Sequence, residues 1–301
     1  MDTAQYIEIY QYSNIKNTPN NGVEKLFVLL NTLINFIVPY KQFCIIFFSF
    51  IIIFLIYKTI YYFSSKISIS VAIMGYVSIF YFQSYNLMRI SLASAIMFFC
   101  FKYLYNKQYI KYLVGLLLAL NIHFSSIIYI FPIFLLLVYK RSILFFYIIV
   151  IVAIISTIYF SDLISSLVTY ERYLNYFQTN EKSNIGLLVI INHIPVLAML
   201  LYSKRLNLEK ELIAIFTVFT FASFIIGLLS YSISIIGRLY IYFTYPFLLF
   251  IPYFLYNLKM EKPKIYWIIL PFVFIYFIFR FVIYMQQYLF IDGIMPYKTL
   301  F

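Results

Sequence analysis

The sequence has little charge, and this scarcity excludes most classes of soluble protein. Only 11% of the residues are charged and 64% are hydrophobic, whereas soluble domains carry about 25% charged residues. Such a chain cannot cover its surface with polar groups in water, so it needs lipid as its solvent. Its apolar runs are continuous and close to the length of about 20 residues that a membrane-spanning helix needs, unlike the short alternating segments of a barrel. We therefore predict an all-α, polytopic membrane protein.

Motifs of cofactor chemistry are also scarce. The two cysteines, Cys44 and Cys100, lie in apolar runs without a nearby His or Cys, which favours buried hydrophobic side chains over a disulfide or a metal site. The sequence contains no phosphate-binding loop, no glycine-rich dinucleotide turn, no His-Glu-x-x-His and no carboxylate pair at metal-ligand spacing. We expect no cofactor and no metal. The net charge of +12 comes from basic residues between apolar runs, which indicates topology and no nucleic-acid partner.

Ten apolar segments predict about ten transmembrane helices in one bundle, 43–283. They are 43–63, 68–85, 88–105, 109–126, 127–139, 143–160, 186–202, 211–230, 239–257 and 265–283. Before the bundle, residues 1–42 form a polar segment in which 26–38 is typical of an amphipathic helix. Residues 161–185 form a polar loop and 284–301 a polar tail. The segment 127–139 is short and contains Pro132, which favours a tilted or re-entrant element.

The basic residues predict the orientation of the bundle. The hydrophilic stretches between the apolar segments alternate between lysine-rich ones and ones with fewer basic residues. The positive-inside rule assigns the lysine-rich stretches, such as 102–111 and 259–264, to the cytoplasm. Residues 1–42, the loop 161–185 and the tail 284–301 are then extracytoplasmic. Four of the six arginines fall on this outer side, namely Arg89, Arg172, Arg238 and Arg280. Because guanidinium binds phosphate through a planar fork, this distribution indicates an anionic ligand there.

Three of these arginines have sequence contexts that favour function to different degrees. Asn86 and Arg89 stand where one span ends and the next begins, followed by small residues that let helices approach closely; the alternative is an arginine that reaches the interface. Arg238 begins a tyrosine-rich span, where interfacial anchoring is the alternative. Arg172 follows Glu171 in the outer loop, so a solvated charge also explains it. Arg280, at the end of the last span, is better explained as an interface residue.

Both histidines lie in the outer halves of their spans. His123 stands in Asn-Ile-His-Phe-Ser-Ser at the outer end of a span, and a histidine there can exchange a proton near neutral pH. A hydrogen bond between helices is the alternative. His193 is the weaker candidate because the nearby Pro195 already explains a polar residue through a helix kink.

In their order along nearly the whole chain, these residues resemble the EpsG family of Wzy-type exopolysaccharide polymerases. Family members carry Asn-x-x-Arg at the start of a span, then small residues, a lysine-rich inner turn and a span that ends in His-x-Ser, as in Asn86 to Arg89, 102–111 and His123 to Ser125. They also carry an acidic residue before an amphipathic Leu-Phe segment, like Glu24 before 25–31, and spaced tyrosines, like Tyr6 and Tyr10. Two features depart from the family: Ile90 stands where Gln is usual, and we expect the chain to begin inside the first outer loop, without the usual first span and its arginine.

The resemblance implies a GT-C-like or Wzy-like bundle in the bacterial plasma membrane, with both termini of this chain extracytoplasmic. The implied substrate is an oligosaccharide repeat unit on undecaprenyl diphosphate, polymerised on the outer leaflet without a metal or another cofactor. Membrane lipid, a flippase and a chain-length regulator are the implied partners. We assign Arg89 and Arg238 to the diphosphate, His123 to the acceptor hydroxyl, and Arg172, Asn86, Glu24, Tyr6 and His193 to substrate binding.

Three other functions compete with this interpretation. A ligase of the O-antigen type shares the lipid-diphosphate chemistry but uses another acceptor. A flippase or other transporter would show internal repeats and polar groups near the bilayer midplane, whereas the polar groups here gather on the outer side. A membrane O-acyltransferase would need a donor site on the inner face, where only lysine-rich turns occur.

Overall fold

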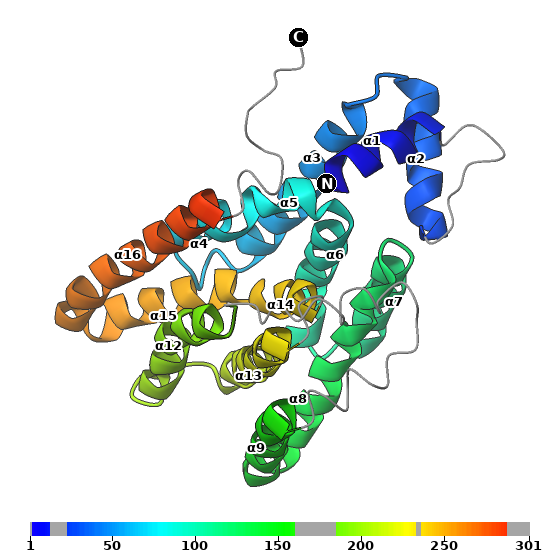
Figure 1. Ribbon diagram of the computed structural model, residues 1–301. Coiled ribbons are helices and arrows are strands. Elements are labelled where there is room, and N and C mark those ends of the chain that lie inside the picture. Colours follow the sequence, from blue (N-terminus) through cyan, green and yellow to red (C-terminus); the bar gives the residue numbers. More distant parts are fainter. Residues whose placement is uncertain (1, 13–22, 160–184, 233–235, 288–301) are drawn as a thin grey trace. The chain divides into compact units, whose positions relative to one another are not determined.

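The computed structural model describes residues 2–12, 23–159, 185–232 and 236–287, and every regular element in these ranges is a helix (Figure 1). The chain divides into two compact units. Unit 1 comprises 1–127 and 251–301, and unit 2 comprises 128–250. The predicted all-α fold is confirmed.

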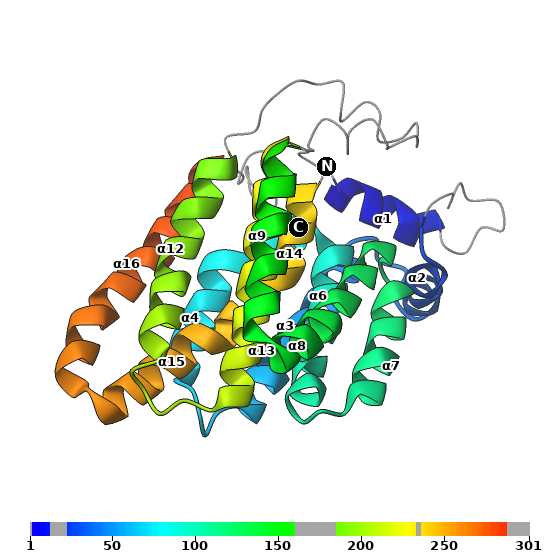
Figure 2. The ribbon, with the colours of Figure 1, turned by 90° about the horizontal axis from the view of Figure 1, so that it is seen from below.

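Unit 1 contains α1 (Asp2–Tyr12), α2 (Lys25–Ile37), α3 (Phe43–Tyr62), α4 (Ile69–Tyr76), η1 (Val77–Tyr81), α5 (Gln83–Asn86), α6 (Met88–Tyr105), α7 (Tyr109–Leu120) and α16 (Pro263–Gln287). Helix α6 packs against α3 and α7. Its buried small residues, among them Ser91, Ala93 and Ser94, allow this close approach. Figure 2 shows α6 and α7 from the side and α2 almost end-on.

Unit 2 contains α8 (Phe131–Arg141), α9 (Ile143–Tyr159), α12 (Ile185–Ser203), α13 (Lys210–Ser232) and α14 (Gly237–Thr244). Helix α13 packs against the other four, and Figure 2 shows it beside α9 and α12. Gly227 permits the contact with α12, because a Cβ there would lie 2.5 Å from a methyl carbon of Val189. Two helices cross the boundary between the units along the chain: η2 (Phe124–Ile130) and α15 (Phe247–Glu261).

Each of the ten apolar segments predicted to span the membrane is helical in the described residues. Six helical stretches are long and apolar enough to cross a membrane: Phe43–Tyr62, Met88–Tyr105, Phe124–Arg141, Lys210–Ser230, Gly237–Glu261 and Pro263–Gln286. The other four segments correspond to shorter apolar helices: Ile69–Tyr81, Tyr109–Leu120, Ile143–Thr157 and Val189–Ser203. The amphipathic helix predicted at 26–38 is α2.

The local structure departs from four of the predicted segments. Segment 239–257 is divided by a turn at Tyr245 and Pro246, between α14 and α15. Segment 68–85 is interrupted by the π-helical turn η1 and the short helix α5, a local rearrangement of the backbone hydrogen bonds that the hydropathy pattern does not reveal. Segment 109–126 ends early, at Leu120, where the Asn121 amide donates to the carbonyl of Leu117 (2.8 Å). Segment 127–139 lies within a longer helical stretch, Phe124–Arg141, in which η2 leads into α8. Pro132 is in the first turn of α8, where proline is tolerated.

Candidate active site

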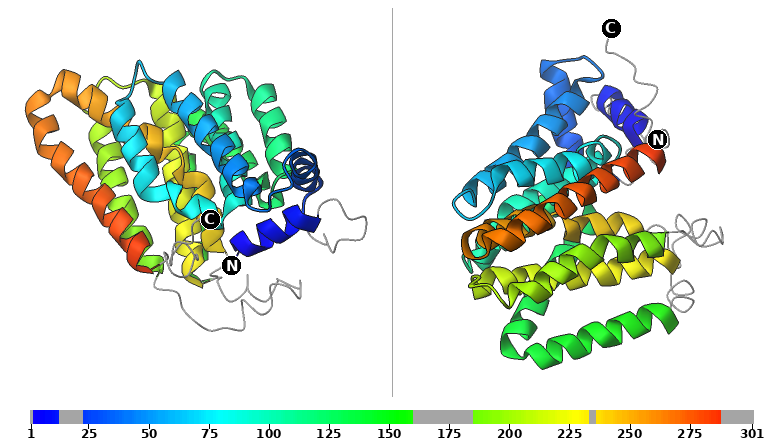
Figure 3. Two further views of the ribbon diagram at one scale, coloured as in Figure 1. Left: turned by 90° about the horizontal axis from the view of Figure 1, so that it is seen from above. Right: turned by 90° about the vertical axis from the view of Figure 1, so that its left-hand side faces the viewer.

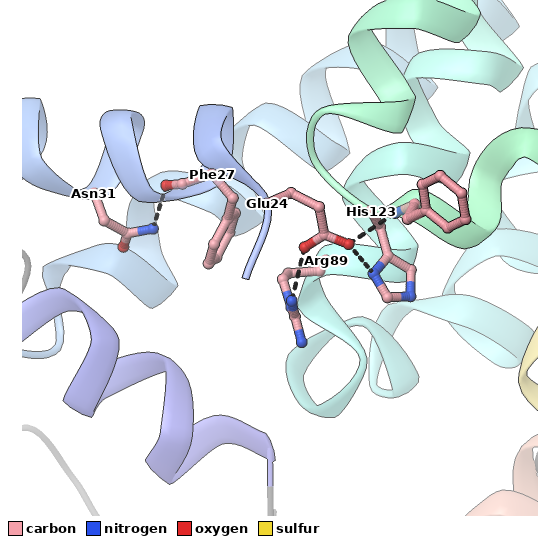
Figure 4. A network of polar contacts seen from close by, with 6 residues as sticks. Glu24, Phe27, Asn31, Arg89 and His123 are labelled. Atoms are coloured by element: carbon pink, nitrogen blue, oxygen red, sulfur yellow. Dashed lines mark hydrogen bonds and ion pairs between the residues drawn. The ribbon is translucent and has the colours of Figure 1, made fainter. Parts of the chain in front are cut away.

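Three polar side chains from distant parts of unit 1 meet at one point, which we call the Glu24 cluster: Glu24, Arg89 and His123 (Figure 4). Glu24 directly precedes α2 in an extended conformation, and its side chain makes no capping hydrogen bond to that helix. The carboxylate lies between Arg89 and His123 instead. The start of α2, the start of α6 and the turn after α7 thus supply one residue each.

Arg89 is on the first turn of α6, and its Nη1 donates to Glu24 Oε2 at 2.8 Å. Both side chains are 16% exposed. The guanidinium carbon lies 5.9 Å from the ring centre of Tyr6 and 6.0 Å from that of Phe27, within the range of a cation–π contact. Arg89 is therefore held by one ion pair and two rings, in a largely desolvated place.

The second carboxylate oxygen of Glu24 accepts two hydrogen bonds. His123 Nδ1 lies 3.1 Å from Oε1, and the backbone N–H of Phe124 donates to the same oxygen at 2.7 Å. The early end of α7 makes this possible, because His123 follows the last helical turn and the backbone N–H of Phe124 points at Glu24. A carboxylate accepts but cannot donate, so Nδ1 carries the proton.

These contacts determine the charge of Glu24. Burial raises the pKa of its carboxyl, but the hydrogen bonds from His123 and Phe124 and the positive charge of Arg89 outweigh burial, and the pKa falls to about 2. Glu24 is thus a carboxylate at neutral pH, which fixes the tautomer of a neutral His123 with Nδ1 protonated and Nε2 free to accept a proton.

Comparison with protein families gives one finding that covers almost the whole chain. The family model described as "EpsG family" matches residues 1–299. The chain belongs to the EpsG family. Neither the curated proteins nor the solved structures contain a match.

The Glu24 cluster of this EpsG-family chain still has hydrogen-bonding capacity to offer a ligand. Within the described residues, Arg89 donates one hydrogen bond of the five that a guanidinium can make, and its buried Nε has no partner. His123 is 21% exposed, and no described residue hydrogen-bonds to its Nε2. The site can therefore donate to an oxyanion and accept a proton at neighbouring points. In the described part of the chain, no three His, Cys, Asp or Glu side chains are placed to hold a metal ion.

Of the predicted site residues, the structure brings Glu24, Arg89, His123 and Tyr6 together. Asn86 ends α5, three residues before Arg89. Sequence reasoning missed two groups, the ring of Phe27 and the backbone N–H of Phe124. Phe27 stands three residues after Glu24, in the first turn of α2, and this spacing could have indicated that the two side chains lie together. A backbone N–H donor such as that of Phe124 cannot be recognised from the residue types.

The remaining predicted residues of this EpsG-family chain belong to unit 2 or fall outside the described residues. Arg238 is exposed on the first turn of α14, in unit 2, so a cavity shared with Arg89 stays a prediction. His193 is fully buried in unit 2, where Nδ1 contacts the carbonyl of Val189 and Nε2 contacts Ser223 Oγ, both at 2.8 Å. These contacts link α12 to α13, so packing alone also explains His193, and its assignment to substrate binding stays a prediction. Arg172 lies outside the described residues.

Proposed function

We propose that this chain polymerises lipid-diphosphate-linked oligosaccharide repeat units, with undecaprenyl diphosphate as the lipid, on the outer leaflet of a bacterial plasma membrane. Membership of the EpsG family supports a role in exopolysaccharide polymerisation. The observation that supports the chemistry is the Glu24 cluster, in which a guanidinium with unused donors lies beside an imidazole of fixed tautomer.

In this proposal Arg89 holds the diphosphate of the growing chain. Its free N–H donors bind phosphate oxygens and offset the charge that develops as the diphosphate departs. Glu24 and the rings of Tyr6 and Phe27 fix the guanidinium in place before substrate arrives, so little ordering is needed at the moment of reaction. Arg238 and Arg172 are the candidates for further phosphate contacts.

His123 activates the acceptor in the same proposal. Its Nε2 takes the proton from a hydroxyl of the incoming repeat unit, while Glu24 holds Nδ1–H and stabilises the imidazolium that forms. The hydroxyl oxygen bonds to the anomeric carbon of the growing chain. The bond from that carbon to the diphosphate oxygen breaks, and undecaprenyl diphosphate leaves with the electron pair. The leaving group is already activated, so the step consumes no nucleotide.

Two substitutions in cells test this proposal. Arg89→Lys keeps the charge but loses the planar fork, and His123→Gln keeps a hydrogen-bonding side chain that cannot take a proton. Both variants should insert normally, yield no long polymer and accumulate single lipid-linked repeat units. Arg280→Lys, on α16, is the matched control and should leave the polymer unchanged. Normal polymer ladders from both Arg89→Lys and His123→Gln would show that the Glu24 cluster is not the active site.

A further inference from the structure

Helix α2 is amphipathic, but its apolar face is exposed and its asparagines are buried. Its exposed face consists of large apolar side chains: Leu29 (53% exposed), Leu33 (54%), Phe36 (85%) and Ile37 (77%). Its opposite face is buried and contains both asparagines of the helix, Asn31 and Asn35, beside Phe27 and Ile34. A helix at a water-covered surface turns its polar face outward, so water is the wrong medium for the exposed face of α2.

The buried face is held by specific contacts that fix the rotation of the helix about its axis. Asn35 donates to the carbonyl of Tyr10 in α1 at 2.6 Å, and the hydroxyl of Tyr10 donates to the carbonyl of Val38 at 2.5 Å. Phe27 stacks on Phe48 of α3 with ring centres 5.0 Å apart. Turning Phe36 and Ile37 inward would break all three contacts. The outward apolar face is therefore built into the packing of unit 1.

The orientation of α2 suits a membrane surface. Figure 2 and the left view of Figure 3 look almost along the axis of α2, whereas Figure 2 shows α6 and α7 from the side, so α2 runs across the direction of these helices. Residues 38–42 connect it to the candidate span α3, and five residues reach at most about 18 Å. Helix α2 thus stays beside the start of α3.

Helix α3, which follows α2 along the chain, also has exposed apolar side chains. The exposed side chains of α3 nearest its start are Ile46 (48% exposed) and Phe50 (67%), and α3 is one of the helices apolar enough to cross a membrane. Both helices belong to unit 1 and are joined by the short segment 38–42, so lipid is the occupant that fits the exposed apolar side chains of both.

We infer that α2 lies in the plane of the bilayer, with Leu29, Leu33, Phe36 and Ile37 among the acyl chains of the leaflet in which α3 begins. The apolar face of a helix of this kind is buried about 5–10 Å into the boundary between the headgroups and the acyl chains. Lys25 is exposed at the first turn of α2, where its long side chain can reach the lipid phosphates. Since Glu24 directly precedes α2, the Glu24 cluster is held at headgroup depth. If the proposed function holds, that is the depth at which a lipid diphosphate presents its phosphates.

The depth of α2 can be measured by tryptophan fluorescence, because Trp267 is the only tryptophan in the chain. In a Trp267→Phe background we would place one tryptophan at Phe36 or Leu33, with Gln11→Trp as the control on the exposed side of α1. The full chain is reconstituted in phosphatidylcholine vesicles with or without bromine in the middle of the acyl chains, and iodide in the buffer reports contact with water.

The inference predicts that brominated lipid lowers the fluorescence of Phe36→Trp and Leu33→Trp by roughly twofold, because both lie within the acyl region, and that iodide does not affect them. Gln11→Trp should show the opposite pattern. Quenching of Phe36→Trp by iodide alone would place α2 in water and overturn the inference. Quenching by neither agent would show that a protein surface covers the helix, either a second copy or a partner, and would overturn it as well. The assay contains no substrate, so its outcome is independent of the proposed reaction.

Discussion

Replacing Glu24 with glutamine tests how strongly one carboxylate ties the start of α2 to the rest of unit 1. Glu24 accepts hydrogen bonds from Arg89, His123 and the backbone of Phe124 at 2.8, 3.1 and 2.7 Å. Glutamine keeps the size of the side chain, but it loses the charge and puts an N–H₂ group where one of the two oxygens accepted hydrogen bonds. Arg89 then keeps its buried charge without a counter-ion.

The pKa of Glu24 gives the size of this interaction. It falls from 4.5 to about 2, and each pKa unit corresponds to about 1.4 kcal/mol, so the folded state favours the carboxylate by roughly 3 kcal/mol. The side chain of Glu24 is partly solvated, and screening by solvent reduces its expected contribution to stability to about 2 kcal/mol. Local opening of α2 should therefore become roughly 30-fold more frequent in Glu24→Gln.

Amide hydrogen exchange of peptides that cover 25–37 measures this opening in detergent or nanodiscs. Glu8→Gln, which changes an exposed carboxylate on α1, is the control and should leave exchange unchanged. In the wild-type chain, the stabilisation is fully present above pH 4.5 and is lost as the pH falls toward about 2, because the folded-state pKa is the lower one. Equal protection of α2 in wild type and Glu24→Gln at pH 7 would refute the reasoning.

Two further predictions concern packing. A Cβ at Gly115 would lie 2.2 Å from Cys100 Sγ, so Gly115→Ala should destabilise the contact of α6 with α7 by about 1–3 kcal/mol. Thermal unfolding in detergent measures this loss of stability. A second substitution in the same chain, Cys100→Ala, should restore much of the loss. If Gly115→Ala unfolds like wild type, this contact is looser than the structure indicates. Ser223→Ala removes the hydrogen bond to His193 Nε2 and should cost about 0.6 kcal/mol without shortening the polymer made in cells. Loss of polymer at unchanged stability would instead place His193 in the active site.

The sequence predicted the elements of the fold well because a bilayer imposes a simple pattern. Continuous apolar runs between lysine-rich breaks located helices such as α3, α6 and α16. The interruption at η1 and the early end of α7 were missed, since they depend on how backbone carbonyls are shared within a turn and hydropathy carries no information on that. Likewise, the spacing of apolar residues predicted that 26–38 is amphipathic, but it could not tell which face is buried.

The Glu24 cluster shows the same division between residue types and geometry. Arg89 and His123 were singled out as polar groups at the ends of apolar segments, and Glu24 by resemblance to a family. Glu24 can contact both residues because α2 packs on α1 and α3, which places Glu24 beside Arg89 and His123. No local pattern in the sequence encodes this packing. The sequence assigned Glu24 to substrate binding; in the structure its oxygens are engaged by Arg89, His123 and Phe124, which favours a positioning role.

Glycosyl transfer at the Glu24 cluster is tested most directly with the purified full chain in vesicles and a lipid-diphosphate-linked repeat unit isolated from the producing organism. Wild type and Arg280→Lys should convert these units into a ladder of longer chains and release the lipid diphosphate. Arg89→Lys and His123→Gln should leave the units unconverted while they unfold at the wild-type temperature. A ladder of wild-type length from Arg89→Lys and His123→Gln, or units that wild type moves across the membrane without joining them, would contradict the account.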